Sequence, residues 1–187
     1  MSKDIIYKLY KDKRTVFTFS EIAMLINEPD QAKLKNKINY YVSKNKIKNP
    51  RRGIYAKEDY SAEELAGKIF KPSYISLDYV LQKEGLIFQY SSGITSISYL
   101  SRTIEIDERI FVYRKIKDTI LIETSGIILS DTGLNIATPE RAFLDTLYLN
   151  QDYYCDSISN LNKETVFDLI PIYRSTALKK RIEIYFS

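Results

Sequence analysis

The residues of this chain that are best suited to contact a partner are the cationic side chains within residues 31–57. Lys33, Lys37, Tyr40 and Lys44 recur at i, i+4, i+7 and i+11, a spacing that places them along one side of an α-helix. The apolar residues between them follow the same period on another side, at Leu34, Ile38, Tyr41 and Val42. Lysines on an exposed helix face neutralise nucleic-acid phosphates. A merely solvated lysine face has the same pattern, and for this segment alone both interpretations stay open.

Amide and guanidinium groups accompany these lysines. Gln31 and Asn36 each carry the paired donor and acceptor that can read adenine in a major groove. Arg51 and Arg52 fall in an Asn-Pro-Arg-Arg-Gly turn between two short runs that can pair as strands. A basic amphipathic helix followed by an arginine-tipped hairpin is typical of a winged helix-turn-helix, whose third helix enters the major groove. The predicted DNA-binding residues are therefore Gln31, Lys33, Asn36, Lys37, Tyr40, Lys44, Arg51 and Arg52.

Other chemistries have weaker support in the sequence. The chain has no histidine and a single cysteine, Cys155, which excludes histidine-based acid–base catalysis, an internal disulfide and a multi-cysteine zinc site. No glycine-rich phosphate loop is present. Glu105 and Asp107 would share one face of a strand and could hold Mg²⁺, although an exposed strand face beside a turn is the more common explanation. We expect no enzyme activity, no cofactor and no metal.

Charge is distributed unevenly along the 187 residues, whose formal net charge is +4. Residues 1–57 contain fourteen Lys and Arg against five acids, a net of +9, and residues 58–187 contain fourteen against nineteen, a net of −5. This change of sign predicts a DNA-binding domain over residues 1–57 and a second domain over 58–187. The first residues lack the apolar stretch of a signal peptide, and no apolar run is long enough to cross a bilayer. We expect a cytoplasmic protein that does not contact a membrane.

The order of predicted elements in the first part is that of a winged helix-turn-helix. We expect a helix over residues 3–11, an extended link over 15–19, and a second helix over 21–26 capped by Ser20. Asn27 to Asp30 form a turn, since Pro29 disfavours helix at the residue before it and Asp30 can cap the basic helix that follows. The hairpin over residues 47–56 completes the unit.

The second part reads as an α+β domain with an antiparallel sheet. Ser61 and Glu64 have the spacing of a capping box that opens a helix through Ile69, and Ser73 is expected to start another helix over 74–84. Strand-like runs follow at 86–90, 94–100, 103–106, 110–116, 120–123, 127–129 and 134–137, with hairpin turns expected near residues 92–93, 107–108 and 131–133. Thr138 and Pro139 mark the start of a helix that runs to about Asn150. Asn162 can cap a further helix through Ile170, and the tail from Thr176 is ambiguous between helix and strand.

Several segments of the chain together resemble the AbiEi family of antitoxins from type IV toxin–antitoxin, or abortive-infection, systems. They read RGIYA at 52–56, ELAGKIFKPSYISL at 64–77, EGLI at 84–87 and ATPERAFLD at 137–145. The resemblance covers the chain from the second helix to about Leu149. It places Glu140 and Arg141 in a structural signature of the second domain, and Arg141 can pair with Asp145 at i+4.

The resemblance implies a two-domain bacterial regulator without enzyme activity. Its first domain would bind inverted repeats upstream of its own operon and repress transcription. Its second domain would counteract a nucleotidyltransferase-like toxin encoded beside it, which is the expected functional partner, in general without a stable complex. The residues themselves leave an alternative open, namely a one-component transcriptional regulator whose second domain senses a small ligand.

Overall fold

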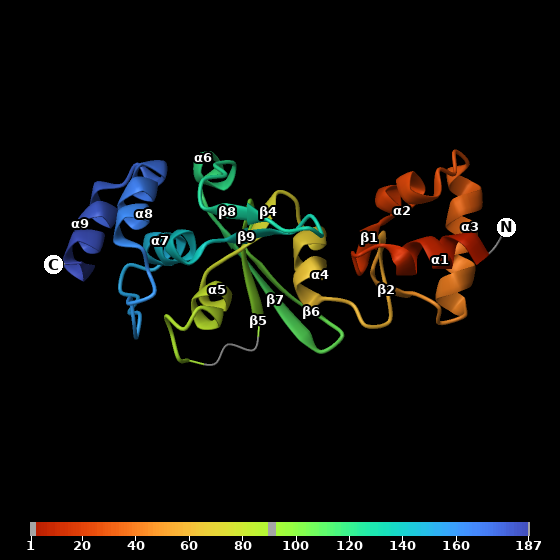
Figure 1. Cartoon of the computed structure of the whole chain (residues 1–187), viewed down its shortest axis with the longest axis horizontal. Helices are drawn as coiled ribbons and strands as arrows, with labels where there is room; N and C mark the ends of the chain where they lie inside the picture. The colour runs from red at the N-terminus through yellow and green to blue at the C-terminus, as the bar shows by residue number, and fades with distance from the viewer. Residues whose placement is uncertain (1–2, 90–92, 187) are drawn as a thin grey trace. The chain divides into compact units, whose positions relative to one another are not determined.

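The computed structural model describes residues 3–89 and 93–186, and the chain divides into two compact units, Met1–Ile69 and Phe70–Ser187. Both units combine helices with a β-sheet, so the protein is α+β (Figure 1). The first sheet is antiparallel, with the strand order β1-β3-β2. Among the described residues, the second sheet has six strands and mixes parallel with antiparallel pairs.

The first unit consists of three helices and a hairpin, followed by a further helix. Its elements are α1 (Lys3–Lys11), β1 (Val16–Thr18), α2 (Phe19–Ile26), α3 (Gln31–Ser43), β2 (Lys48–Arg51), β3 (Ile54–Ala56) and α4 (Ala62–Ile69). Two side chains fix where the helices begin. Thr18, and not the expected Ser20, caps α2 and forms a capping box with Glu21. The carboxylate of Asp30 caps α3 by accepting from the Lys33 amide at 2.9 Å, as predicted.

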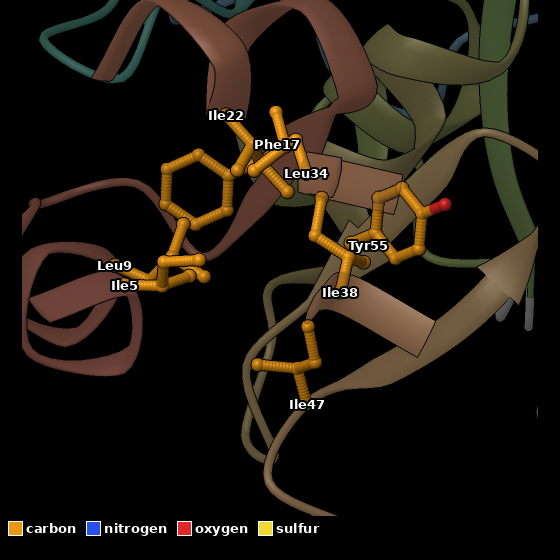
Figure 2. Packing of buried hydrophobic residues seen from close by; sticks show 8 residues of the cluster. All are labelled: Ile5, Leu9, Phe17, Ile22, Leu34, Ile38, Ile47 and Tyr55. Atoms are coloured by element: carbon orange, nitrogen blue, oxygen red, sulfur yellow. The ribbon is translucent and has the colours of Figure 1, made fainter. Parts of the chain in front are cut away.

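The core of the first unit lies between the three helices and the hairpin. Leu34 and Ile38 of α3 are completely buried, and Figure 2 shows both beside Tyr55 of β3. Complete burial of each such aliphatic side chain stabilises the fold by about 1.5–3 kcal/mol. The remaining members of the cluster come from α1, β1, α2 and the start of the hairpin: Ile5, Leu9, Phe17, Ile22 and Ile47. Because its apolar stripe is fixed in this core, α3 turns its opposite side to solvent.

Helix α4 belongs to the first unit, so that unit extends past the boundary expected at Lys57. Ser61 accepts from the Glu64 amide at 3.3 Å, which is one half of the predicted capping box. The Glu64 carboxylate does not return to Ser61 but accepts from the amides of Thr15 and Val16, at 2.6 and 3.0 Å. The Ser61 amide in turn donates to Thr15 Oγ1. These bonds tie the start of α4 to β1.

The charge contrast is smaller for the units of the structure than for the predicted domains. Residues 58–69 contain Lys68 and four acids, Glu58, Asp59, Glu63 and Glu64. The first unit therefore has fifteen Lys and Arg against nine acids, a net of +6, and the second has thirteen against fifteen, a net of −2. The first unit is still the basic one.

The second unit is built on a mixed sheet with the strand order β6-β7-β5-β4-β9-β8. The strands are β4 (Ser73–Ile75), β5 (Gly93–Ser98), β6 (Arg102–Ile106), β7 (Arg109–Lys115), β8 (Ile127–Leu129) and β9 (Asn135–Ala137). The antiparallel sheet expected from the sequence is confirmed in part. β4 pairs antiparallel with β5, β6 with β7 and β8 with β9, whereas β7 runs parallel to β5 and β9 runs parallel to β4.

The predictions for three individual elements of this unit are wrong. Ser73 begins strand β4 and does not begin a helix, because Tyr74 and Ile75 pair with β5; the helix α5 starts later and spans Asp78–Lys83. The expected strand over 120–123 is absent, because its first two residues belong to helix α6 (Asp118–Leu121) and the next two form no strand. Residues 86–89 form no strand, and the rest of that predicted run, together with Ser92 in the turn expected after it, lies outside the described residues.

Two helices begin at their predicted start signals, since Thr138 caps α7 (Pro139–Leu149) and Asn162 caps α8 (Lys163–Leu169). The 3₁₀-helix η1 (Ile170–Tyr173) follows α8, and the tail, whose sequence is ambiguous between helix and strand, forms α9 (Thr176–Tyr185), which Ser175 caps. Across residues 3–89 and 93–186, no helix has the length and apolarity to cross a membrane.

Candidate nucleic-acid interface

The outward side of α3 is polar and cationic. At 100° per residue, Asn36 lies opposite the buried Leu34 and Ile38, with Lys33 and Tyr40 beside it. Lys33 and Asn36 are exposed, and the Tyr40 side chain is 56% exposed. A long aromatic side chain that projects this far from a helix is available for contact with a partner.

Other predicted residues of α3 already have partners within the first unit. The Lys37 ammonium lies 3.2 Å from the Glu28 carboxylate, in the turn before α3. Lys44 lies over the ring of Tyr40, with its Nζ 5.9 Å from the ring centroid. These two cations fall on the same flank of α3 as Lys33, whereas Gln31 falls on the opposite flank, at the helix start.

The hairpin turn is formed by Arg52 and Gly53, which is tighter than the five-residue turn expected from the sequence. Gly53 has φ +79, a conformation that a side chain would strain. The Asn49 side chain donates to the carbonyls of Arg51 and Ile54, at 2.8 and 2.6 Å, and so closes the turn. Arg52 is exposed at its tip, while Arg51 on β2 is half-buried.

A hollow of about 380 Å³ separates the start of α3 from this turn. It is lined by Phe19, Gln31, Ala32, Lys35, Arg52, Gly53 and Tyr55. The Phe19 amide at the start of α2 donates to the Gly53 carbonyl at 3.1 Å, so α2 and the turn are fixed to each other. The structure thus brings Gln31 and Arg52 to one site. Lys35 lies there too, and the sequence reasoning missed it, although its i+4 spacing from Gln31 was a usable signal.

Asp12 and Glu21 of the first unit are paired with neighbouring cations. Arg14 binds the Asp12 carboxylate through two nitrogens, at 2.7 and 3.0 Å, and these hydrogen bonds lower the pKa of Asp12 despite its partial burial. Partial burial of Glu21 would raise its pKa, but hydrogen bonds from Lys68 and Thr18 outweigh that effect and lower it. Both carboxylates therefore remain charged near neutral pH, and they are paired with Arg14 and Lys68.

The second unit has a different kind of charged cluster, which is centred on Arg141 of α7. Arg141 is completely buried and lies between two tyrosine rings, each 5.5 Å from its guanidinium carbon. It donates to the carbonyls of Ile120 and Ser125 at 2.8 and 2.9 Å, and to Tyr74 at 3.2 Å. Its Nε donates to Asp145 at 3.3 Å, which is the i+4 pair that the sequence suggested.

Asp145 completes the cluster. Its carboxylate accepts from Tyr173 at 2.7 Å and from Ser76 at 2.8 Å. Complete burial raises the pKa of the Asp145 carboxyl, which the Arg141 charge and the donated hydrogen bonds oppose, and burial also raises the pKa of both tyrosines. No buried side-chain nitrogen or oxygen lacks a partner in the part of the chain that the structure describes. The guanidinium of Arg141 thus donates its hydrogen bonds to groups inside the second unit.

The acidic pair considered for Mg²⁺ does not have the expected geometry. Glu105 is on β6, but Asp107 follows the end of that strand in a turn with φ 49, so the two do not share a strand face. Among the described residues, no group of three or more His, Cys, Asp or Glu side chains is arranged to hold a metal ion. Burial raises the pKa of the Cys155 thiol to about 12, which makes it a poor nucleophile.

Comparison of the chain with known protein families and with curated proteins gives no match.

Proposed function

We propose that the first unit is a winged helix-turn-helix that binds operator DNA. In this proposal α3 enters the major groove with Lys33, Asn36 and Tyr40, and the β2–β3 hairpin is the wing whose Arg52 reaches the backbone or a minor groove. The observation that supports it best is the outward face of α3, which is polar and cationic and lies beside a braced hairpin with an arginine at its tip. Lys37 and Lys44 contribute mainly positive potential on one flank.

We further propose that the whole chain is an antitoxin of the AbiEi type, acting in the cytoplasm. It represses its own operon through an inverted repeat and counteracts a nucleotidyltransferase-like toxin through the second unit. The support for this half is the set of motif segments described above. The structure adds a physical role for one of them, since Arg141 and Asp145 of the ATPERAFLD segment hold the second unit together.

The DNA-binding half is tested with the full chain by gel shift on DNA from immediately upstream of its gene, titrated from low to physiological salt against an unrelated duplex. Each phosphate contact adds about 0.9 to the slope of log K against log salt. We expect retention of the upstream DNA at physiological salt. Asn36→Ala should reduce the preference for the upstream sequence. Lys33→Gln should weaken binding to both duplexes and lower the slope of log K against log salt.

Lys180→Gln is the matched control, because it removes an exposed charge from the second unit. Equal binding of the two duplexes that disappears with salt would refute the operator proposal and leave only a basic surface. Wild-type affinity in both α3 variants would refute the assignment of α3 as the DNA-contacting helix.

The antitoxin half needs a separate experiment. Induced expression of the nucleotidyltransferase-like protein encoded by the neighbouring gene should arrest growth, and co-expression of this chain should restore it. The Asn36→Ala variant should restore growth as well as the wild type does, since neutralisation is assigned to the second unit. Specific DNA binding without any rescue of growth would favour a ligand-sensing regulator instead.

A further inference from the structure

The hollow between α3 and the hairpin has a composition that suits a particular part of DNA. Its walls include the rings of Phe19 and Tyr55 and the methyl group of Ala32, while its cations are Lys35 and Arg52. None of the described residues that line it is acidic. An anion with an apolar body matches such a site better than a bare inorganic anion, because cations attract the charge and apolar walls take up carbon atoms.

The walls of the hollow are held in place before any ligand arrives. The Phe19 amide binds the Gly53 carbonyl, and Asn49 braces both sides of the turn. Gly53 contributes no side chain, and a Cβ placed there would meet no atom within 4 Å, so the space above the turn is open. A preformed site loses less entropy on binding than one that must first be ordered.

The hollow lies next to the side of α3 that is proposed to contact DNA. Ala32 lines it and is also exposed on the same side of α3 as Asn36. A strand whose bases meet Asn36 would therefore carry its backbone past the hollow, between α3 and the hairpin.

We infer that this hollow is a subsite for one sugar-phosphate unit of the bound DNA, with Lys35 and Arg52 holding the same phosphate and the apolar walls contacting the deoxyribose. The inference rests on the proposed DNA-binding function. It assigns a DNA contact to Lys35 and gives Arg52 a specific partner, a phosphate adjacent to the major groove. It also explains how the register of α3 on the duplex is fixed, since contacts to phosphates position a protein while contacts to bases select the sequence.

The experiment is a scan of the upstream duplex in which one phosphate at a time is replaced by an uncharged methylphosphonate, with the full chain as the ligand. One position should weaken binding of the wild type and have little effect on the double variant Lys35→Gln/Arg52→Gln. Because two cations share one phosphate, the double variant should lower the salt slope by about 0.9 and not by about twice that value. Each single variant should lower it by less.

Lys46→Gln is the control, since Lys46 is exposed in the same unit but does not line the hollow. It should leave the sensitive phosphate unchanged. If every methylphosphonate that weakens binding of the wild type also weakens binding of the double variant, while binding stays specific for the upstream duplex, the subsite is refuted and the proposed function stands. If neither the wild type nor any variant prefers the upstream duplex, the proposed function is refuted, and the subsite is refuted with it. Binding of free deoxyribose 5-phosphate that is lost in the double variant, without any sensitive phosphate in the duplex, would identify a small-molecule site and refute the DNA subsite.

Discussion

Two arginines in this protein have opposite environments. Arg141 in the second unit donates four hydrogen bonds to neighbouring groups and is inaccessible to solvent. Arg52 in the first unit is exposed at the tip of a hairpin, beside a hollow. A guanidinium presents five N–H groups in a fixed fork, and where those groups donate decides what the residue does. Arg141 therefore stabilises the folded second unit, whereas Arg52 is exposed and can bind a partner.

The largest expected effect is that of removing the buried guanidinium. Arg141→Met keeps a long apolar side chain but leaves the Asp145 carboxylate without its cation and two carbonyls without their donor. Breaking a buried charge pair in this way costs about 3–5 kcal/mol. Urea unfolding followed by near-ultraviolet circular dichroism of the tyrosines should show a much earlier transition for the second unit.

Arg52→Met is the matched variant from the other environment, and it should change the free energy of unfolding by less than about 0.5 kcal/mol, as exposed substitutions usually do. The order of the two variants should be reversed for DNA binding. Arg52→Met should weaken the salt-dependent binding of DNA, whereas Arg141→Met should retain it as long as its first unit stays folded. Equal losses of stability in the two variants would contradict the comparison.

A glycine beside Arg141 gives the next largest effect. A Cβ on Gly126 would lie 2.9 Å from Arg141 Cβ and 3.1 Å from Leu169 Cδ1, and the residue has φ +74. Gly133 has a similar φ of +77 but no atom within 4 Å of a Cβ. An alanine at either site costs about 1–2 kcal/mol for its conformation. Crowding at Gly126 adds about 1–3 kcal/mol, so Gly126→Ala should unfold at a lower temperature than Gly133→Ala.

The sequence predicted the first unit well because its signals are local. Asp30 as the cap of α3, the apolar stripe of Leu34 and Ile38, and the hairpin after it all depend on neighbours a few residues apart. The carboxylate of Glu64, in contrast, accepts from the amides of Thr15 and Val16, and the first unit extends to the end of α4. A capping pattern does not contain this long-range information.

Prediction was weaker where distant strands decide the structure. The segment around Tyr74 and Ile75 has apolar residues that suit either a helix or a strand, and pairing with β5 and β9 selects the strand. The same limit applies to the candidate site. Spacing along the helix led to the prediction of Lys33 and Asn36 as DNA-binding residues, but only the placement of the hairpin shows that Lys35 and Arg52 line the same hollow.

Glu21 is a half-buried acid of the first unit that pairs with Lys68 and takes part in the capping box of α2. Its pKa is lowered in the folded state, so the unfolded state binds the proton more readily, and the resulting stability is present above about pH 4.5 and is lost as pH falls further. Glu21→Gln should destabilise the protein by about 1 kcal/mol at neutral pH, a value reduced by solvent screening. The acid unfolding curves of Glu21→Gln and the wild type should converge as the pH falls through the lowered pKa of Glu21, whereas Asp59→Asn, at an exposed site, should match the wild type throughout.

The smallest expected effect concerns the pair between Lys37 and Glu28, whose side chains are 38% and 16% exposed. A partly exposed ion pair contributes less than about 1 kcal/mol, so Lys37→Ala should barely change stability. Because Glu28 already holds this lysine, Lys37→Ala should also weaken DNA binding less than Lys33→Ala does. Glu28→Gln releases the ammonium and removes a negative charge beside α3, so it should strengthen binding by at most about fivefold at low salt, with the gain disappearing as salt rises. A loss of affinity in Glu28→Gln would mean that the acid positions Lys37 for its contact, and the flank of α3 would then belong to the interface itself.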